Sequence, residues 1–200
     1  MAKEIEKRVY LSPEEAERVI AELDVRGAQW SYRRRLLMDF SGSLEGRDLQ
    51  VMVRVNDGVP ELSIKKGGVG DTERQESSVF SRGNLADMLE AVALLGYTEA
   101  NYGLRRMQEC QADGVEVSLR YILDIEDPET VIGVNLEIEA LPGSIEQHVD
   151  DMLELLGLEP LTKQESKDLF KRLHKEANTD YIHSEKAALE ISELAAIYAT

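Results

Sequence analysis

Most strand-like segments of this chain carry aliphatic side chains on one face and charges on the other. In residues 47–56, one leucine and three valines alternate with Gln50, Met52 and Arg54. Successive side chains of a strand point to opposite faces, so this segment has an apolar face and a polar face. Comparable segments recur along the first 140 residues, at 4–11, 31–40, 61–66, 73–80, 103–110, 115–124 and 132–140. The chain is therefore constrained to a sheet with one charged face.

Turn and cap signals indicate how these segments are connected. Asp57-Gly58 and Asp113-Gly114 predict antiparallel hairpins. Ser12 and Glu15 form a capping-box pattern that predicts a helix over 13–26. Further helices are predicted over 84–95, 145–157, 162–176 and 184–199. We therefore expect an α+β fold, and eight antiparallel strands are enough to close into a β-barrel.

Charge and composition exclude several classes of protein. The chain has 200 residues, 39 acidic and 23 basic, and a net charge of −16. Binders of nucleic acids and of anionic membranes depend on basic surfaces, so we expect neither partner here. A single cysteine excludes an internal disulfide, and no apolar run reaches transmembrane length. We expect a cytoplasmic protein.

The charged strand faces hold both acidic and basic groups. Two E-x-E pairs, Glu4/Glu6 and Glu137/Glu139, each place two carboxylates on one strand face, about 7 Å apart along the strand. Basic residues follow the same period of two on other strands. If the sheet closes with these faces inward, the buried charges require partners. A polyanion together with a divalent cation would satisfy both signs, since carboxylates bind Mg²⁺ or Mn²⁺ and arginines bind phosphate.

An alternative interpretation remains open from the pattern alone. An open sheet has one solvated face, and alternating glutamate and lysine commonly lie on such a face. In that case the charged positions would bind no ligand.

The order of these residues resembles that of the CYTH superfamily, the triphosphate tunnel metalloenzymes. The family's N-terminal E-x-E-x-K is similar to residues 4–8, EIEKR, with Arg8 at the lysine position. Later segments are similar in order over about residues 4–140: Arg54 in VMVRV, Lys65 ending LSIK, Arg74 and Glu76, Leu123-Asp124, Gly133, and LEIE at 136–139.

This resemblance implies an eight-stranded antiparallel tunnel that binds a triphosphate together with Mg²⁺ or Mn²⁺. It implies metal ligands at Glu4, Glu6, Glu137 and Glu139, supported by Glu76 and Asp124. The implied phosphate-binding residues are Arg8, Arg54, Lys65, Arg74, Arg105 or Arg106, and Arg120. Lys65, with Glu4 and Glu6, is the implied catalytic set, Lys65 polarising a phosphate. The strand period leaves Arg105 and Arg106 as alternatives.

Two departures from the family pattern bear on activity. Met52 replaces an arginine and Ser78 replaces a glutamate. The sequence thus favours a metal-dependent triphosphatase, with a noncatalytic polyphosphate- or nucleotide-binding protein as the main alternative. An adenylate cyclase is a third possibility.

The predicted organisation has two parts. Residues 1–158 form the tunnel domain, and residues 159–200 form a C-terminal helical extension packed on the barrel. We expect a small-molecule triphosphate as ligand and a possible homodimer.

Overall fold

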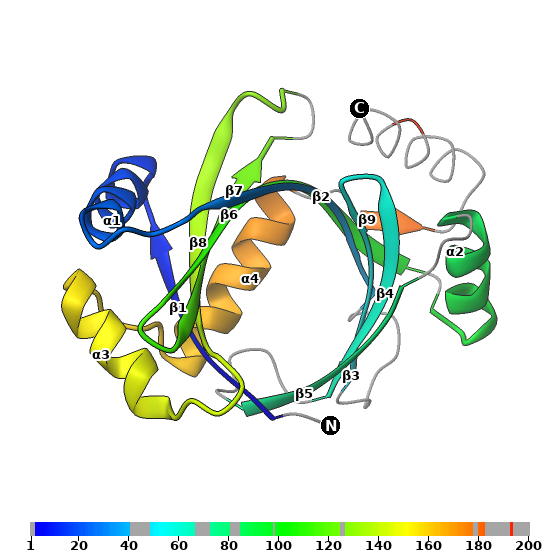
Figure 1. The fold of residues 1–200 in the computed structure, drawn as a ribbon. Helices are drawn as coiled ribbons and strands as arrows, with labels where there is room; N and C mark the ends of the chain where they lie inside the picture. Colours follow the sequence, from blue (N-terminus) through cyan, green and yellow to red (C-terminus); the bar gives the residue numbers. More distant parts are fainter. Residues whose placement is uncertain are drawn as a thin grey trace.

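A computed structural model shows eight antiparallel strands arranged in a ring (Figure 1). The structure describes residues 3–40, 49–66, 73–80, 85–97, 99–124, 127–177, 180–182 and 193. The predicted helix over 184–199 therefore lies, apart from residue 193, outside the described residues. The eight strands are β1 (Lys3–Leu11), β2 (Ser31–Asp39), β3 (Leu49–Asn56), β4 (Val59–Lys66), β5 (Glu73–Phe80), β6 (Glu99–Ala112), β7 (Val115–Leu123) and β8 (Val131–Ala140).

The order of strands around the ring is β2-β3-β4-β5-β1-β8-β7-β6, and β2 also pairs with β6. Nine residues of β2 pair with β6, from Ser31 opposite Glu109 to Asp39 opposite Asn101. This pairing closes the ring, so the predicted α+β fold with an eight-stranded antiparallel barrel is confirmed. A short ninth strand, β9 (Asp180–Ile182), was not predicted; it pairs with the start of β6.

Local sequence signals explain the tight hairpins and the first helix. Asp57 and Asp113 both have positive φ, as do the glycines that follow them. Two successive residues with positive φ form the turn that matches strand twist. Helix α1 (Pro13–Val25) begins with the predicted capping box: Ser12 Oγ accepts the Glu15 N–H, and Glu15 accepts the Ser12 N–H.

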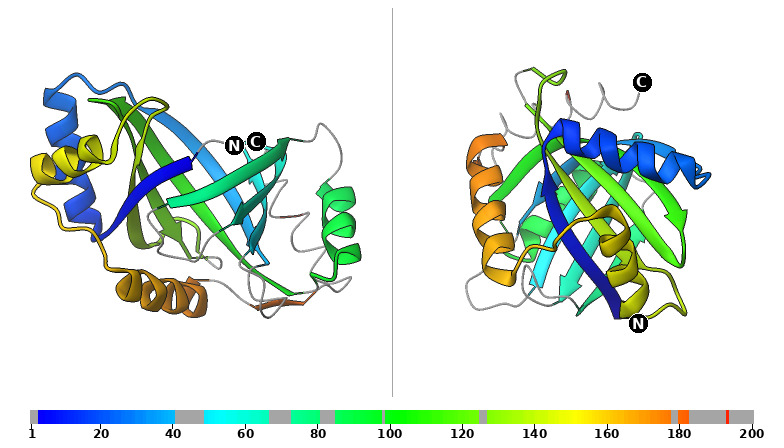
Figure 2. Two further views of the ribbon diagram at one scale, coloured as in Figure 1. Left: turned by 90° about the horizontal axis from the view of Figure 1, so that it is seen from below. Right: turned by 90° about the vertical axis from the view of Figure 1, so that its left-hand side faces the viewer.

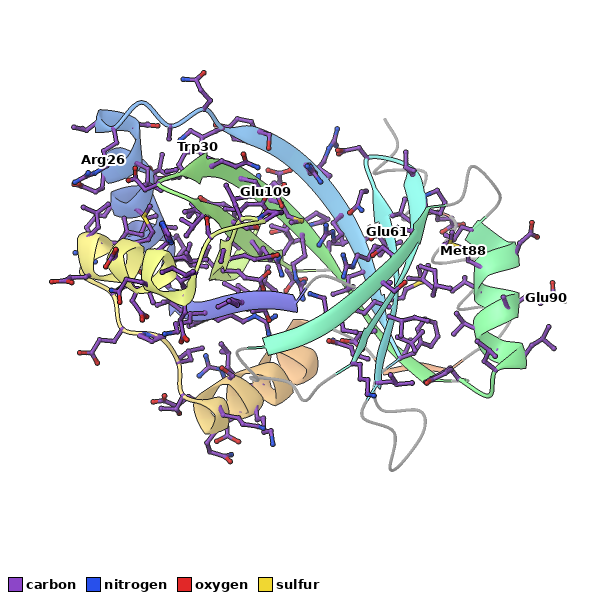
Figure 3. The ribbon with its side chains drawn as sticks, turned by 60° about the horizontal axis from the view of Figure 1, so that its bottom comes forward. Arg26, Trp30, Glu61, Met88, Glu90 and Glu109 are labelled. Atoms are coloured by element: carbon purple, nitrogen blue, oxygen red, sulfur yellow. The ribbon has the colours of Figure 1, made fainter. Side chains whose placement is uncertain are left out.

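The two larger hydrophobic clusters of the described residues lie outside the ring, between the strands and the helices. Helices α1 and α3 (Glu146–Leu156) cover the apolar face of β1, β6, β7 and β8, where residues such as Leu119 and Leu136 are fully buried. Helix α2 (Leu85–Leu94) covers the opposite side of the ring (Figure 2). There Met88 points from α2 toward the strands, whereas Glu90 points away (Figure 3). The polar strand faces therefore point into the ring.

The ring has a short seam between β1 and β5. Within the described residues, these strands pair over three positions, Lys3–Ile5 of β1. Beyond the seam, the Leu161 N–H donates to the Arg8 carbonyl at 2.8 Å. Helix α4 (Lys163–Ala177) follows and lies at one end of the ring (Figure 2), where Leu169 packs with Tyr10 and Ile122. No described helix is long and apolar enough to cross a membrane.

Gly133 allows Tyr10 to cross the neighbouring strand. A Cβ atom on Gly133 would lie 1.9 Å from the Tyr10 hydroxyl oxygen and 2.5 Å from Cζ. The Tyr10 hydroxyl donates to the Ile132 carbonyl at 3.4 Å, and the Arg172 guanidinium lies 5.3 Å from the ring centre. The glycine therefore makes room for the contact between β1, β8 and α4.

Gly133→Ala is expected to lower the free energy of unfolding by about 1–3 kcal/mol, because an overpacked core must shift its side chains. Tyr10→Leu shortens the side chain that meets the new methyl group. The double variant should therefore be more stable than the sum of the two single changes predicts. Urea denaturation of the four proteins measures this coupling, and strictly additive effects would contradict the predicted contact.

Candidate functional site

Strand register brings the polar residues of four neighbouring strands onto one face. Residues directly opposite each other on paired strands share a face. Glu6 lies opposite Glu139, and Arg8 lies opposite Glu137. Ser118 lies opposite Glu137 and also opposite Glu109. The shared face is the one turned away from the helices, so these side chains line the lumen of the ring.

Three carboxylates meet in this lumen. Glu6, Glu137 and Glu139 each offer an oxygen, and these oxygens lie within 4.8 Å of one another. Glu6 and Glu137 are buried, at 4% and 1% relative exposure. Carboxylate oxygens are the ligands preferred by small divalent cations such as Mg²⁺ and Mn²⁺. The donor set therefore fits the divalent ion that the family resemblance implies.

Two arginines bind the same carboxylates. Arg8 Nη2 lies 2.5 Å from Glu6 Oε1, and Arg8 Nε donates to Glu137 Oε2 at 2.9 Å. Arg120 binds both oxygens of Glu137, with Nη1 at 2.8 Å from Oε2 and Nη2 on Oε1. Burial alone would raise the pKa of Glu137, but the charges of Arg120 and Arg8 hold this pKa far below its ordinary value. Glu137 is thus a carboxylate ion throughout the physiological pH range.

A second group of charges lines β2, β3 and β4. The Arg35 Nε donates to Asn56 Oδ1 at 2.6 Å, and Asn56 donates to Glu61 at 2.8 Å. Arg54 lies 3.6 Å from Glu61 and donates to Ser63 at 3.0 Å. Burial, followed by the like charges of Arg54 and Arg120, lowers the pKa of Arg35 to about 9. The lumen therefore holds Arg35 as a cation in a site that disfavours its charge.

Lys65 and Glu109 complete the lining on opposite halves of the wall. Lys65 is 5% exposed, and its charge contributes to the low pKa of Glu137. Glu109 accepts from Ser118 at 3.4 Å and lies 3.2 Å from Arg33 Nε. Figure 3 shows Glu61 and Glu109 on different sides of the ring, from β4 and β6. Both halves of the lumen wall thus carry positive and negative groups.

The structure separates the two arginine alternatives on β6. Arg105 lies opposite Ile122 and Arg35, on the lumen face, whereas Arg106 lies opposite Tyr121 and Arg34, on the outer face. Arg106 is exposed, and its closest described acidic partner is Glu129 at 4.0 Å. Of this pair, only Arg105 is on the lumen face.

Other predicted site residues are placed less centrally. Asp124 follows the end of β7, where its Oδ1 accepts the Asp127 N–H at 3.2 Å, so it belongs to the β7–β8 loop and not to the carboxylate group. The side chains of Glu4, Arg74 and Glu76 lie outside the described residues. Their backbone register places Glu4 opposite Arg74 and Glu76 opposite Lys65.

Several lumen residues were not predicted from the sequence: Arg35, Asp39, Glu61, Glu109 and Glu116. A usable signal existed for some of them. Arg33, Arg35 and Asp39 share one parity within 31–40, and this parity is the one that β6 places on the lumen face. In the run Arg33-Arg34-Arg35 the middle, outer-facing residue is also charged. The alternation between charged and apolar positions is therefore absent from the sequence at this point.

Comparison with known proteins identifies the fold. No family model matches the sequence, and no curated protein matches it. Among solved structures, the PH1012 protein of Pyrococcus horikoshii OT3 is 17% identical with a TM-score of 0.62, and the match covers 81% of this chain and 98% of that one. The candidate adenylyl cyclase HpAC1 of Hippeastrum, described as having a dominant triphosphatase activity, is 14% identical with a TM-score of 0.54, over 86% and 95% of the two chains.

A candidate adenylate cyclase of Vibrio parahaemolyticus is 9% identical with a TM-score of 0.50, over 94% and 97% of the chains. This chain therefore shares its fold with these structures. Likeness at these identities establishes the architecture, and a fold by itself assigns no activity. The chemistry of the lumen must be argued from its side chains.

Arg35→Met is expected to raise the melting temperature by roughly 2–6 °C without ligand. Replacing a disfavoured buried charge by an apolar side chain stabilises a protein by about 1–2 kcal/mol. The same change should reduce the stabilisation that added tripolyphosphate produces, because one cation of the lumen is lost. Differential scanning fluorimetry measures both effects.

Arg34→Met is the matched control, since Arg34 is the neighbouring arginine on the exposed outer face. It should change neither quantity appreciably. A destabilised Arg35→Met protein that keeps the full tripolyphosphate response would contradict this description of the lumen.

Proposed function

We propose that this chain is a divalent-metal-dependent triphosphatase that hydrolyses a phosphoanhydride bond inside its lumen. Water attacks a phosphorus atom, the bond to the bridging oxygen breaks, and the products are phosphate and a diphosphate. The substrate class is inorganic tripolyphosphate or a nucleoside or thiamine triphosphate. The structural neighbour HpAC1, which is described as having a dominant triphosphatase activity, supports this reaction type.

One observation carries the proposal: three arginines with mutually unfavourable charges share the lumen. Arg54 and Arg120 both lower the pKa of Arg35, in addition to the effect of burial. An anion with several negative charges would relieve this repulsion and accept hydrogen bonds from the guanidinium groups. A triphosphate has the required charge and the length to contact cations on several strands.

The carboxylate group supports the metal requirement. Glu6, Glu137 and Glu139 are the described residues that would hold Mg²⁺ or Mn²⁺. Such an ion, when bound, neutralises charge on phosphate oxygens and lowers the pKa of water.

The chain's own cations would position the substrate. Arg35, Arg54 and Lys65 would bind phosphate oxygens from one side of the lumen, and Arg120 from the other. Phosphoryl transfer depends mainly on such positioning and on neutralisation of charge. Lys65, which is buried and close enough to influence Glu137, is the residue we propose to polarise the phosphate that is attacked.

A second candidate function is binding without catalysis. Met52 is buried on the lumen face, and Arg54 Nη2 lies 3.9 Å from its sulfur. A thioether contributes no positive charge to a phosphate, so this position supplies packing where the family pattern has an arginine. Such a lumen would still bind a triphosphate through its remaining cations.

The test is phosphate release from tripolyphosphate and from ATP, each with Mg²⁺, with Mn²⁺ and with EDTA. We expect metal-dependent turnover that Glu6→Gln reduces at least about 100-fold, more than the loss typical of residues outside the ligand shell. The matched control is Glu154→Gln, the same change at an exposed position of α3, which should retain full activity.

Each other outcome has a defined meaning. Release at background together with a tripolyphosphate-induced rise in melting temperature would overturn the enzyme in favour of the binding protein. Pyrophosphate and a cyclic nucleotide from ATP would indicate a cyclase. If tripolyphosphate is neither hydrolysed nor able to raise the melting temperature, both proposed functions are contradicted.

A further inference from the structure

The carboxylates that fit a divalent ion are bound to arginines in this structure. Arg8 contacts Glu6 and Glu137 at 2.5 and 2.9 Å, and thereby links two of the three members of the group. Arg120 binds both oxygens of Glu137. The same side chains are therefore needed by two different kinds of partner, a metal ion and an arginine.

We infer that Arg8 is an exchangeable counter-ion that couples the binding of metal to the binding of triphosphate. In the ligand-free protein it neutralises Glu6 and Glu137. When a triphosphate enters the lumen, the guanidinium transfers to phosphate oxygens, and the two carboxylates become available to the metal. This inference rests on the proposed function, and it concerns the order and linkage of binding at that site.

A metal ion alone meets an obstacle at Glu137. The two oxygens of this carboxylate accept three N–H groups from Arg8 and Arg120, and a carboxylate offers about four acceptor positions. A divalent ion would also approach two guanidinium charges at short range. Because a buried charge that loses its partner is strongly disfavoured, the metal cannot displace the arginines unless another anion receives them.

A triphosphate alone meets the converse obstacle. It can accept hydrogen bonds from Arg8 and Arg120, but their transfer leaves Glu6 and Glu137 buried beside a polyanion. Like charges in a poorly solvated site repel strongly. A divalent ion between the carboxylates and the phosphates removes this repulsion, so each ligand favours the other.

Arg8 rather than Arg120 is the link between the carboxylates. Arg120 binds Glu137 and Ser118, whereas Arg8 spans Glu6 and Glu137. Arginine has the several donors needed to hold two carboxylates at once, and it keeps its charge at any physiological pH. Removing Arg8 should therefore release Glu6 Oε1 and one of the three occupied acceptor positions of Glu137, and so ease metal binding without an anion.

The experiment measures Mn²⁺ affinity from the electron paramagnetic resonance signal of the free ion, with and without a saturating tripolyphosphate analogue that has P–NH–P bridges. The affinity of the analogue for Mn²⁺ is measured without protein and subtracted. We expect the analogue to tighten Mn²⁺ binding to the protein at least about 10-fold, within the usual range of coupling between sites.

The variants are Arg8→Met, Arg8→Lys and the matched control Lys7→Met. Arg8→Met should bind Mn²⁺ alone about 10-fold more tightly than the wild type, and its coupling should fall below about 3-fold. Arg8→Lys keeps the positive charge but has a single nitrogen, so its Mn²⁺ affinity and its coupling should lie between those of Arg8→Met and the wild type. Lys7 immediately precedes Arg8 on β1 but binds Glu146 and Asp150 of α3, so Lys7→Met should behave like the wild type.

The failures are distinguishable. If wild-type protein binds both the analogue and Mn²⁺ but each is indifferent to the other, this inference is wrong and the proposed function stands. If the coupling between the analogue and Mn²⁺ is equal in the wild type and in Arg8→Met or Arg8→Lys, Arg8 does not link the two binding events. If the analogue binds neither with nor without Mn²⁺, the proposed function itself fails.

Discussion

The structure depends on how the charges inside the ring are compensated. A closed barrel with aliphatic outer faces packs α1, α2 and α3 on the outside, which is where the two larger hydrophobic clusters lie. The polar faces are consequently enclosed, and buried ions require partners. On one side of the lumen, two carboxylates form ion pairs with two arginines: Glu6 and Glu137 with Arg8 and Arg120. On the other side Arg35 stays in an unfavourable site, which is the feature that an anion would correct.

The same compensation limits what the site can do without ligands. Internal ion pairs allow the chain to fold around a charged lumen. Under the proposed function, they also occupy the groups that the metal and the triphosphate need. A binding site built in this way exchanges internal pairs for external ones. The proposed linkage between metal and triphosphate is a direct consequence of that exchange.

The sequence predicted the wall of the ring better than its contents. Alternation located the eight strands, and the two Asp-Gly turns located their hairpins, because both signals are local. The contacts of Arg35 and Glu109 depend on the register between β2 and β6, two strands separated by about 70 residues of chain. Periodicity within one segment carries no information about that register. The same limit left Arg105 and Arg106 undecided. The metal role of Asp124, which the resemblance implied, stays a prediction; this residue lies in the β7–β8 loop.

The most direct test of the account is a crystal structure of the protein with Mn²⁺ and the P–NH–P tripolyphosphate analogue. Anomalous scattering locates the manganese independently of the phosphates. The account predicts a manganese peak bonded to Glu6, Glu137 and Glu139, with Arg8 and Arg35 on phosphate oxygens. A lumen that contains neither ligand, with Arg8 still bound to Glu6 and Glu137, would contradict it.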